Sequence, residues 1–169
     1  MGIQTEVMSG LVQFVAVGQD DPLAEPLLAE LALEYSGRYG GTAERVMEWL
    51  RAHPAADFAP PHGGLFVGLL DGQPVTGGAF QRYDDDTAEL KRIWTASDHR
   101  KRGYAKVLLA ELEAEIARRG YRRVYLTTGH RQPEAEALYT SAGYIRLAEP
   151  LPAEGDDTVF PIAFEKALR

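Results

Sequence analysis

The sequence contains no cysteine in its 169 residues. This absence excludes a disulfide framework, a thiolate metal site and a cysteine nucleophile, and it fits a reducing compartment. Long apolar runs are missing as well: no stretch of about 18 apolar residues exists, and residues 1–17 show no basic start followed by an apolar run. Neither a membrane span nor a signal peptide is indicated, so we expect a cytoplasmic protein that does not bind a membrane.

Positive charge is also scarce, with 18 lysines and arginines against 25 acidic residues and a formal net charge of −7. This balance argues against a nucleic-acid partner, because phosphate binding needs an excess of basic residues on one face. Residues 1–90 contain 14 acidic and 4 basic side chains, whereas residues 91–169 contain 11 acidic and 14 basic ones. A basic half can receive a polyanionic cofactor while an acidic half attracts a cationic substrate, although the same charges can serve solubility alone.

Residues that could support metal or hydrolase chemistry are few and poorly spaced. No metal-ligand spacing connects the histidines, which are His53, His62, His99 and His130. No G-x-S-x-G elbow, which a hydrolase nucleophile would need, surrounds Ser36, Ser97 or Ser141. We therefore predict no metal and no hydrolase triad.

Hydrophobic periodicity predicts a layered fold. Two helices are expected first, at 22–39 and from Thr42 to about residue 51. Antiparallel strands follow at 65–70, 75–83 and 87–95, with an Asp71-Gly72 hairpin turn between the first two. The remaining predicted elements are a long helix from about residue 103 to Gly120, a strand at 123–128, a helix at 133–142, and strands at 143–148 and 158–165.

Pro161 lies within the last of these predicted strands and lacks a ladder donor, so we expect it at a sheet edge or a bulge. The order of elements makes a mixed α/β or α+β layered fold. The chain length favours one domain over residues 1–169.

A basic loop precedes the long helix, with the sequence Arg100-Lys101-Arg102-Gly103-Tyr104-Ala105-Lys106. It carries four cations and no acid. A loop that enters a helix exposes unpaired N–H groups at the positive end of the helix dipole, and a glycine lets a pyrophosphate approach the backbone. The pattern suits a phosphate group, but an exposed basic helix start is common and would explain the string equally well.

The residues that flank this loop favour the phosphate interpretation. Arg100-x-x-Gly103-x-Ala105 resembles the acyl-CoA-binding motif of the GCN5-related N-acetyltransferase (GNAT) superfamily. The segment 89–95, with the sequence Glu-Leu-Lys-Arg-Ile-Trp-Thr, is similar to that family's central strand, and 126–144 is similar to its following strand and helix. The resemblance covers about residues 65–168. It implies a mixed, mostly antiparallel central sheet flanked by helices, with an acetyl-CoA-binding core at 65–168 and a helical, substrate-side region at 1–60.

The resemblance implies direct transfer of an acetyl group from acetyl-CoA to an amine. Tyr139 matches the tyrosine that protonates the departing thiolate in many members, although a packed aromatic residue is the alternative. Glu89 matches a glutamate that acts as general base, usually through water, or it is a rim carboxylate that binds the substrate cation. Both readings of Glu89 remain open.

The resemblance also implies the binding residues. Expected around the cofactor are Ile93, Trp94, Thr95, Arg100, Lys101, Arg102, Gly103, Tyr104, Ala105, Lys106 and Gln132, the last standing where many relatives have asparagine. Expected around the acceptor are Tyr35, Tyr39, Trp49, Phe66, Tyr83 and Thr128. The acidic first half favours a small cationic amine, while a protein N-terminus or lysine, a non-catalytic acyl-CoA sensor, a nucleotide-binding protein of another fold and a homodimer all stay open.

Overall fold

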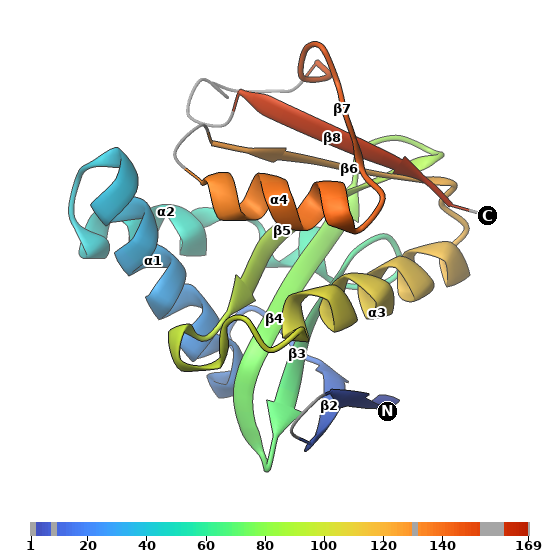
Figure 1. Cartoon of the computed structure of the whole chain (residues 1–169). Helices are drawn as coiled ribbons and strands as arrows, with labels where there is room; N and C mark the ends of the chain where they lie inside the picture. The colour runs from blue at the N-terminus through green and yellow to red at the C-terminus, as the bar shows by residue number, and fades with distance from the viewer. Residues whose placement is uncertain (1–2, 8–9, 130–131, 153–160, 169) are drawn as a thin grey trace.

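An eight-stranded mixed sheet forms the middle layer of the protein, in the order β1-β2-β3-β4-β5-β6-β8-β7 (Figure 1). The structure is a computed structural model that describes residues 3–7, 10–129, 132–152 and 161–168. All neighbouring strands are antiparallel except β5 and β6, which are parallel. The strands are β1 (Ile3–Val7), β2 (Gly10–Ala16), β3 (Gly64–Leu70), β4 (Gln73–Arg82), β5 (Thr87–Thr95), β6 (Arg123–Thr128), β7 (Ile145–Arg146) and β8 (Ile162–Ala167).

Helices cover both faces of this sheet (Figure 1). One face packs against α3 and α4 through a cluster that includes Phe80, Leu108, Leu112 and Phe164. The other face packs against α1 and α2 through a second cluster that includes Leu27, Leu50 and Trp94. The α-helices are α1 (Glu25–Tyr39), α2 (Ala43–Ala52), α3 (Tyr104–Arg118) and α4 (Pro133–Ser141), and short 3-10 turns occupy η1 (Pro22–Ala24), η2 (Ala55–Phe58) and η3 (Ser97–His99).

Local sequence signals explain several of these boundaries and confirm the predicted elements. The Thr42 hydroxyl accepts a hydrogen bond of 3.2 Å from the backbone of Arg45, which satisfies one of the unpaired donors at the start of α2. Asp71 and Gly72 both have positive φ, at 50° and 80°, as the tight turn of the β3–β4 hairpin requires. Gly120, with φ of 95°, follows the last turn of α3.

Two features of the N- and C-terminal regions differ from the sequence prediction. Strands β1 and β2 precede the helices, so residues 1–60 are not only helical; the alternation of buried Val12 and Phe14 with exposed Leu11 is the signal that identifies β2. The strand expected at 143–148 is reduced to Ile145–Arg146.

The last strand is also displaced from its predicted position. It starts after Pro161 and ends at Ala167, while residues 158–160 of the predicted strand lie outside the described residues. β8 lies between β6 and β7 rather than at an edge, and Pro161 avoids the missing ladder bond by preceding the strand.

Candidate active site

A cavity opens where two neighbouring strands separate. β5 and β6 pair only from Thr87–Arg123 to Glu89–Tyr125, whereas β5 stays paired with β4 as far as Thr95. The two strands diverge beyond Glu89, and a cavity of about 1050 Å³ occupies the gap, lined by parts of α1, α2, β5, β6, α4 and the start of α3. This volume lies at the upper end of the usual range for small-molecule sites.

The basic loop forms one end of the cavity. Lys101 and Gly103 have φ angles of 63° and 87°, so the backbone curls tightly before α3, and no side chain caps the first N–H groups of that helix. Lys101 and Lys106 line the cavity, and neither makes an ion pair with a described acidic residue. Uncapped N–H groups, two available ammonium groups and a glycine together suit phosphate oxygens. Arg102, which was predicted to join them, is not among the lining residues.

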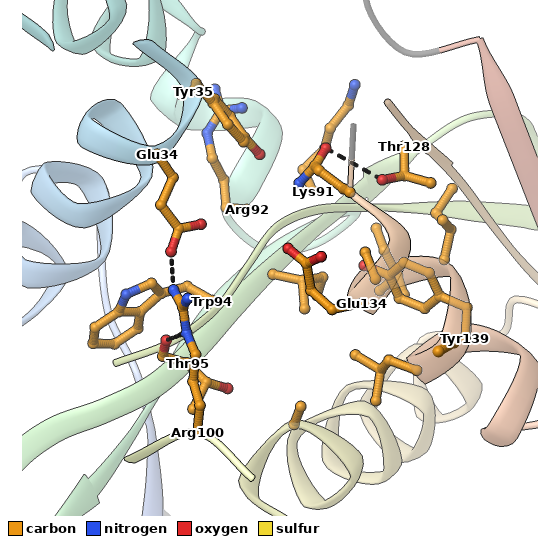
Figure 2. Close-up of a pocket in the computed structure, with 18 of the residues that line it drawn as sticks. Glu34, Tyr35, Lys91, Arg92, Trp94, Thr95, Arg100, Thr128, Glu134 and Tyr139 are labelled. Atoms are coloured by element: carbon orange, nitrogen blue, oxygen red, sulfur yellow. Dashed lines mark hydrogen bonds and ion pairs between the residues drawn. The ribbon is translucent and has the colours of Figure 1, made fainter. Parts of the chain in front are cut away.

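Arg100 anchors the loop through partners within the protein. Its Nε donates to the Thr95 carbonyl at 3.1 Å, and its guanidinium pairs with Glu34 and, at 3.8 Å, with Glu30 (Figure 2). Glu30 in turn accepts from the Trp94 indole at 3.0 Å. The loop is therefore tied to α1, and the Arg100 side chain is already engaged before any ligand binds.

The edge of β5 that faces the gap carries backbone groups without a strand partner. The backbone N–H of Ala96 donates to Val75 at 2.8 Å, so the neighbouring Thr95 presents its backbone to the other side. The Thr95 carbonyl accepts a hydrogen bond from Arg100, so this backbone group points away from β4. Ile93 lies two residues earlier on the same edge, and its N–H is a candidate donor to an acyl oxygen.

Tyr139 projects from α4 into the cavity (Figure 2). Its ring packs against Tyr144 and Phe164, with centroids 5.8 and 5.9 Å away. Its hydroxyl makes no hydrogen bond with another described residue. Burial raises the pKa of Tyr139, and the nearby Tyr35 adds to the effect, so the phenol stays protonated near neutral pH.

Glu89 lies outside the cavity lining, at the point where β5 and β6 are still paired. It is buried, accepts a hydrogen bond from Gln81 Nε2 at 3.2 Å and lies 3.3 Å from the Lys91 ammonium. The opposite end of the Gln81 amide contacts His53 at 2.9 Å. The structure thus connects Glu89 to a cavity residue, His53, through one amide, and its role as base stays a prediction.

The remaining predicted residues divide into two groups. Tyr35, Thr128 and Gln132 line the cavity, as do Ile93, Trp94, Thr95, Tyr104 and Ala105. Tyr39, Phe66 and Tyr83 are not among the lining residues. Tyr39 donates to Gln132 at 3.0 Å, Phe66 lies on β3 with β4 between it and the gap, and Tyr83 lies beyond the closed end of the divergence, packed on Tyr125. Phe66 and Tyr83 are kept from the cavity by their positions in the sheet, which periodicity alone does not give.

Trp49 lines the cavity as expected, but sequence reasoning missed several lining residues on the α1 and α2 side, namely Arg38, His53, Lys91 and Arg92. Arg38 pairs with Glu134. Arg92 lies in a β-bulge of β5, where its φ is 61°. On β4, Gly77 pairs with Trp94 and Ala79 pairs with Lys91, so two residues of β5 lie opposite one residue of β4. No sequence signal marks this bulge.

His53 combines exposure to the cavity with a low proton affinity. Burial lowers its pKa, and the Arg92 charge lowers it further, against the opposing effects of Gln81 and Asp57. The imidazole is therefore neutral near pH 7. With one ring nitrogen engaged by Gln81, the other can accept a proton from a ligand.

Two negative findings concern the residues that the structure describes. Among these residues, no three histidine or acidic side chains are grouped so that they could hold a metal ion. No described helix has the length and apolar character that a membrane crossing requires.

Comparisons with known proteins agree with this geometry. The profile of the acetyltransferase (GNAT) family matches residues 26–144. The uncharacterized N-acetyltransferase YsnE of Bacillus subtilis is 33% identical over 95 residues, which are 54% of this chain and only 62% of that relative.

Solved structures share the fold along nearly the whole chain. A Klebsiella pneumoniae protein described as an acyl-CoA N-acyltransferase matches with a TM-score of 0.72 and 24% identity, covering 94% of this chain and 98% of its own. A GNAT family acetyltransferase from Elizabethkingia anophelis with acetyl-CoA bound has a TM-score of 0.65 and 16% identity, covering 93% and 98%. The fold, the cavity between diverging strands and the family match agree: this chain belongs to the acetyltransferase (GNAT) family.

Proposed function

We propose that this protein transfers an acetyl group from acetyl-CoA to a primary amine by direct attack. The observation that carries the proposal is the cavity itself, because one opening joins a phosphate-binding loop, a strand edge that β6 leaves free and the Tyr139 hydroxyl, which no described residue hydrogen-bonds. Phosphates of the cofactor suit the loop with Lys101, Gly103 and Lys106, and the pantetheine arm suits the gap between β5 and β6. The acceptor then enters from the α1 and α2 side.

The chemical step requires a neutral amine. An alkylammonium group has a pKa of about 10.4 and is not nucleophilic until it loses its proton. His53 supplies a neutral imidazole on the acceptor side of the cavity, and Glu89 supports it through Gln81. We therefore assign the base to His53, with Glu89 as its positioning residue, and keep direct proton removal by Glu89 through water as the alternative.

The amine nitrogen attacks the thioester carbonyl carbon, and the C–S bond breaks as the amide forms. Charge that develops on the carbonyl oxygen is stabilised by the backbone N–H at Ile93. The phenol of Tyr139 gives its proton to the departing sulfur. Because a thiol has a pKa of about 8.5 and burial raises that of Tyr139, the phenol must regain a proton in the same step, which the attacking nitrogen can provide.

The lining does not single out a cationic acceptor. Its two acidic residues, Glu34 and Glu134, are paired with Arg100 and Arg38. The acidic first half of the sequence can raise the local concentration of cations near the protein, but neither described lining carboxylate is left for an ammonium group.

An acetyl-acceptor screen tests the proposal. The protein is incubated with acetyl-CoA and a panel of amino acids, polyamines, aminoglycosides and peptides with free N-termini or lysines, and thiol release is measured beside product mass. We expect acetyl-CoA to raise the melting temperature and at least one amine to release thiol. Binding without turnover on any amine favours the non-catalytic sensor, whereas turnover on peptides alone moves the acceptor to proteins.

A further inference from the structure

One cation of the cavity lining, outside the phosphate-binding loop, pairs with no acidic residue in the parts of the chain that the structure describes. Arg38, Lys91 and Arg100 each pair with a carboxylate, and Lys101 and Lys106 belong to the loop and the start of α3. Arg92 remains: no ion pair connects it to any acidic residue in the described parts of the chain. It lies on the α1 and α2 side, where Figure 2 shows it extending toward Tyr35.

The surroundings of Arg92 satisfy only part of its hydrogen-bonding capacity. The side chain is 9% exposed, yet its one hydrogen bond to a described residue is a long contact of 3.4 Å to the Leu50 carbonyl. Its buried Nε has no partner among the described residues. A guanidinium carries five N–H donors, and leaving such donors unpaired away from water is unfavourable.

Aromatic rings hold the guanidinium in place without supplying acceptors. Its central carbon lies 5.8 Å from the Trp49 ring centroid and 5.6 Å from that of Phe58. Ring faces attract the charge but leave the N–H groups in the guanidinium plane open. An anion that approaches within that plane would complete the site, and a carboxylate matches the two-pronged donor geometry of arginine.

Arg92 and Tyr139 line the same cavity. Tyr35, which also lines it, interacts electrostatically with both residues. Lys91 and Arg92 both act on His53. The acceptor side of the cavity is therefore positive, which is opposite to what the acidic first half of the sequence suggests.

We propose that Arg92 binds a carboxylate on the acceptor, so that the substrate is an amine of the amino-acid type rather than a polycation. This inference rests on the proposed function and narrows its acceptor. The carboxylate would dock in the plane of the guanidinium while the amine reaches His53 and the thioester. The backbone conformation at Arg92, with φ of 61° in the bulge, fixes where the guanidinium lies.

The test compares matched acceptors with and without the carboxylate. Amino acids, their carboxamides and the corresponding decarboxylated amines are assayed with wild-type protein, Arg92→Met and Arg92→Lys. We expect the wild type to favour the amino acid in kcat/KM by about 10- to 100-fold, the range of a charge-assisted bidentate contact. Arg92→Met should remove this preference mainly through KM, and Arg92→Lys should retain part of it.

A matched control and a binding measurement separate the outcomes. Lys91→Met removes the adjacent lining cation, which already pairs with Glu89, and should leave the preference intact. With CoA present, the N-acetylated amino acid should raise the melting temperature of the wild type but not of Arg92→Met. Equal use of decarboxylated amines by the wild type, or an undiminished preference in Arg92→Met, overturns the inference. A third outcome separates the two proposals. If no amine is acetylated but the N-acetylated amino acid still stabilises only the wild type, the enzymatic proposal is wrong and the carboxylate site is supported.

Discussion

Removing the Tyr139 hydroxyl separates catalysis from stability in this protein. The hydroxyl has no hydrogen bond to a described residue, so Tyr139→Phe removes none of the described hydrogen bonds, and the ring still fills its place against Tyr144 and Phe164. We expect the free energy of unfolding to change by less than about 0.5 kcal/mol. A proton donor in the transition state contributes about 10²- to 10⁴-fold in rate, which corresponds to roughly 3–5 kcal/mol of the barrier.

The assay is steady-state thiol release with the acceptor found in the screen, together with the KM for acetyl-CoA. Tyr144→Phe is the matched control, because Tyr144 is not among the lining residues and its hydroxyl donates to Glu113 at 2.8 Å. That variant should lose about 1.5–3 kcal/mol of stability, the usual contribution of a hydrogen bond to a charged group, with kcat unchanged. An unchanged kcat in Tyr139→Phe, with normal acetyl-CoA affinity, would refute the assignment of Tyr139 as proton donor.

Three further predictions address the rest of the cavity. Lys101→Ala should weaken acetyl-CoA binding by about tenfold, measured by calorimetry, without weakening binding of a phosphate-free acetyl-pantetheine thioester. In the wild type, protonation of His53 at low pH removes the base, so the rate should fall on the acidic side of the pH–rate profile. We expect the midpoint of this fall below the ordinary histidine pKa of 6.5, because burial and the Arg92 charge lower the pKa of His53. His53→Gln should abolish this acidic limb. Gly129→Ala should lower the melting temperature, since an added Cβ would lie 1.7 Å from the Tyr39 hydroxyl, and Tyr39→Leu should restore much of the loss.

Local signals made most of the elements predictable. The leucine stripe of α3, the Thr42 cap and the Asp71-Gly72 turn each depend on residues close together in the sequence, and each was confirmed. Of the missed strands, β1 lies at the sheet edge and pairs with β2, and β2 pairs with β3, which follows about 50 residues later, so tertiary contacts fix the place of this hairpin in the sheet.

The site was predictable only where it resembles a family motif. The loop around Gly103 and Tyr139 were expected at the site from the resemblance to the family, and both line the cavity. The aromatic acceptor residues were harder, because an aromatic residue at helical spacing packs in a core more often than it lines a pocket. Tyr35 lines the cavity while Tyr39, four residues along the same helix, instead binds Gln132.

The bulge in β5 explains why sequence patterns did not predict the lining residues on the α1 and α2 side of the cavity. Strict alternation would place Leu90 and Trp94 on one face of the sheet, yet Leu90 packs in the α3 cluster and Trp94 in the α1 and α2 cluster. The extra residue at Arg92 reverses the alternation between them. A strand read with period two therefore assigns the wrong face to every residue after Lys91. Since a positive φ at a non-glycine residue is held only by its surroundings, the contacts of Arg92 with Trp49, Phe58 and Leu50 stabilise the bulge, and the same contacts hold its charge in the cavity lining.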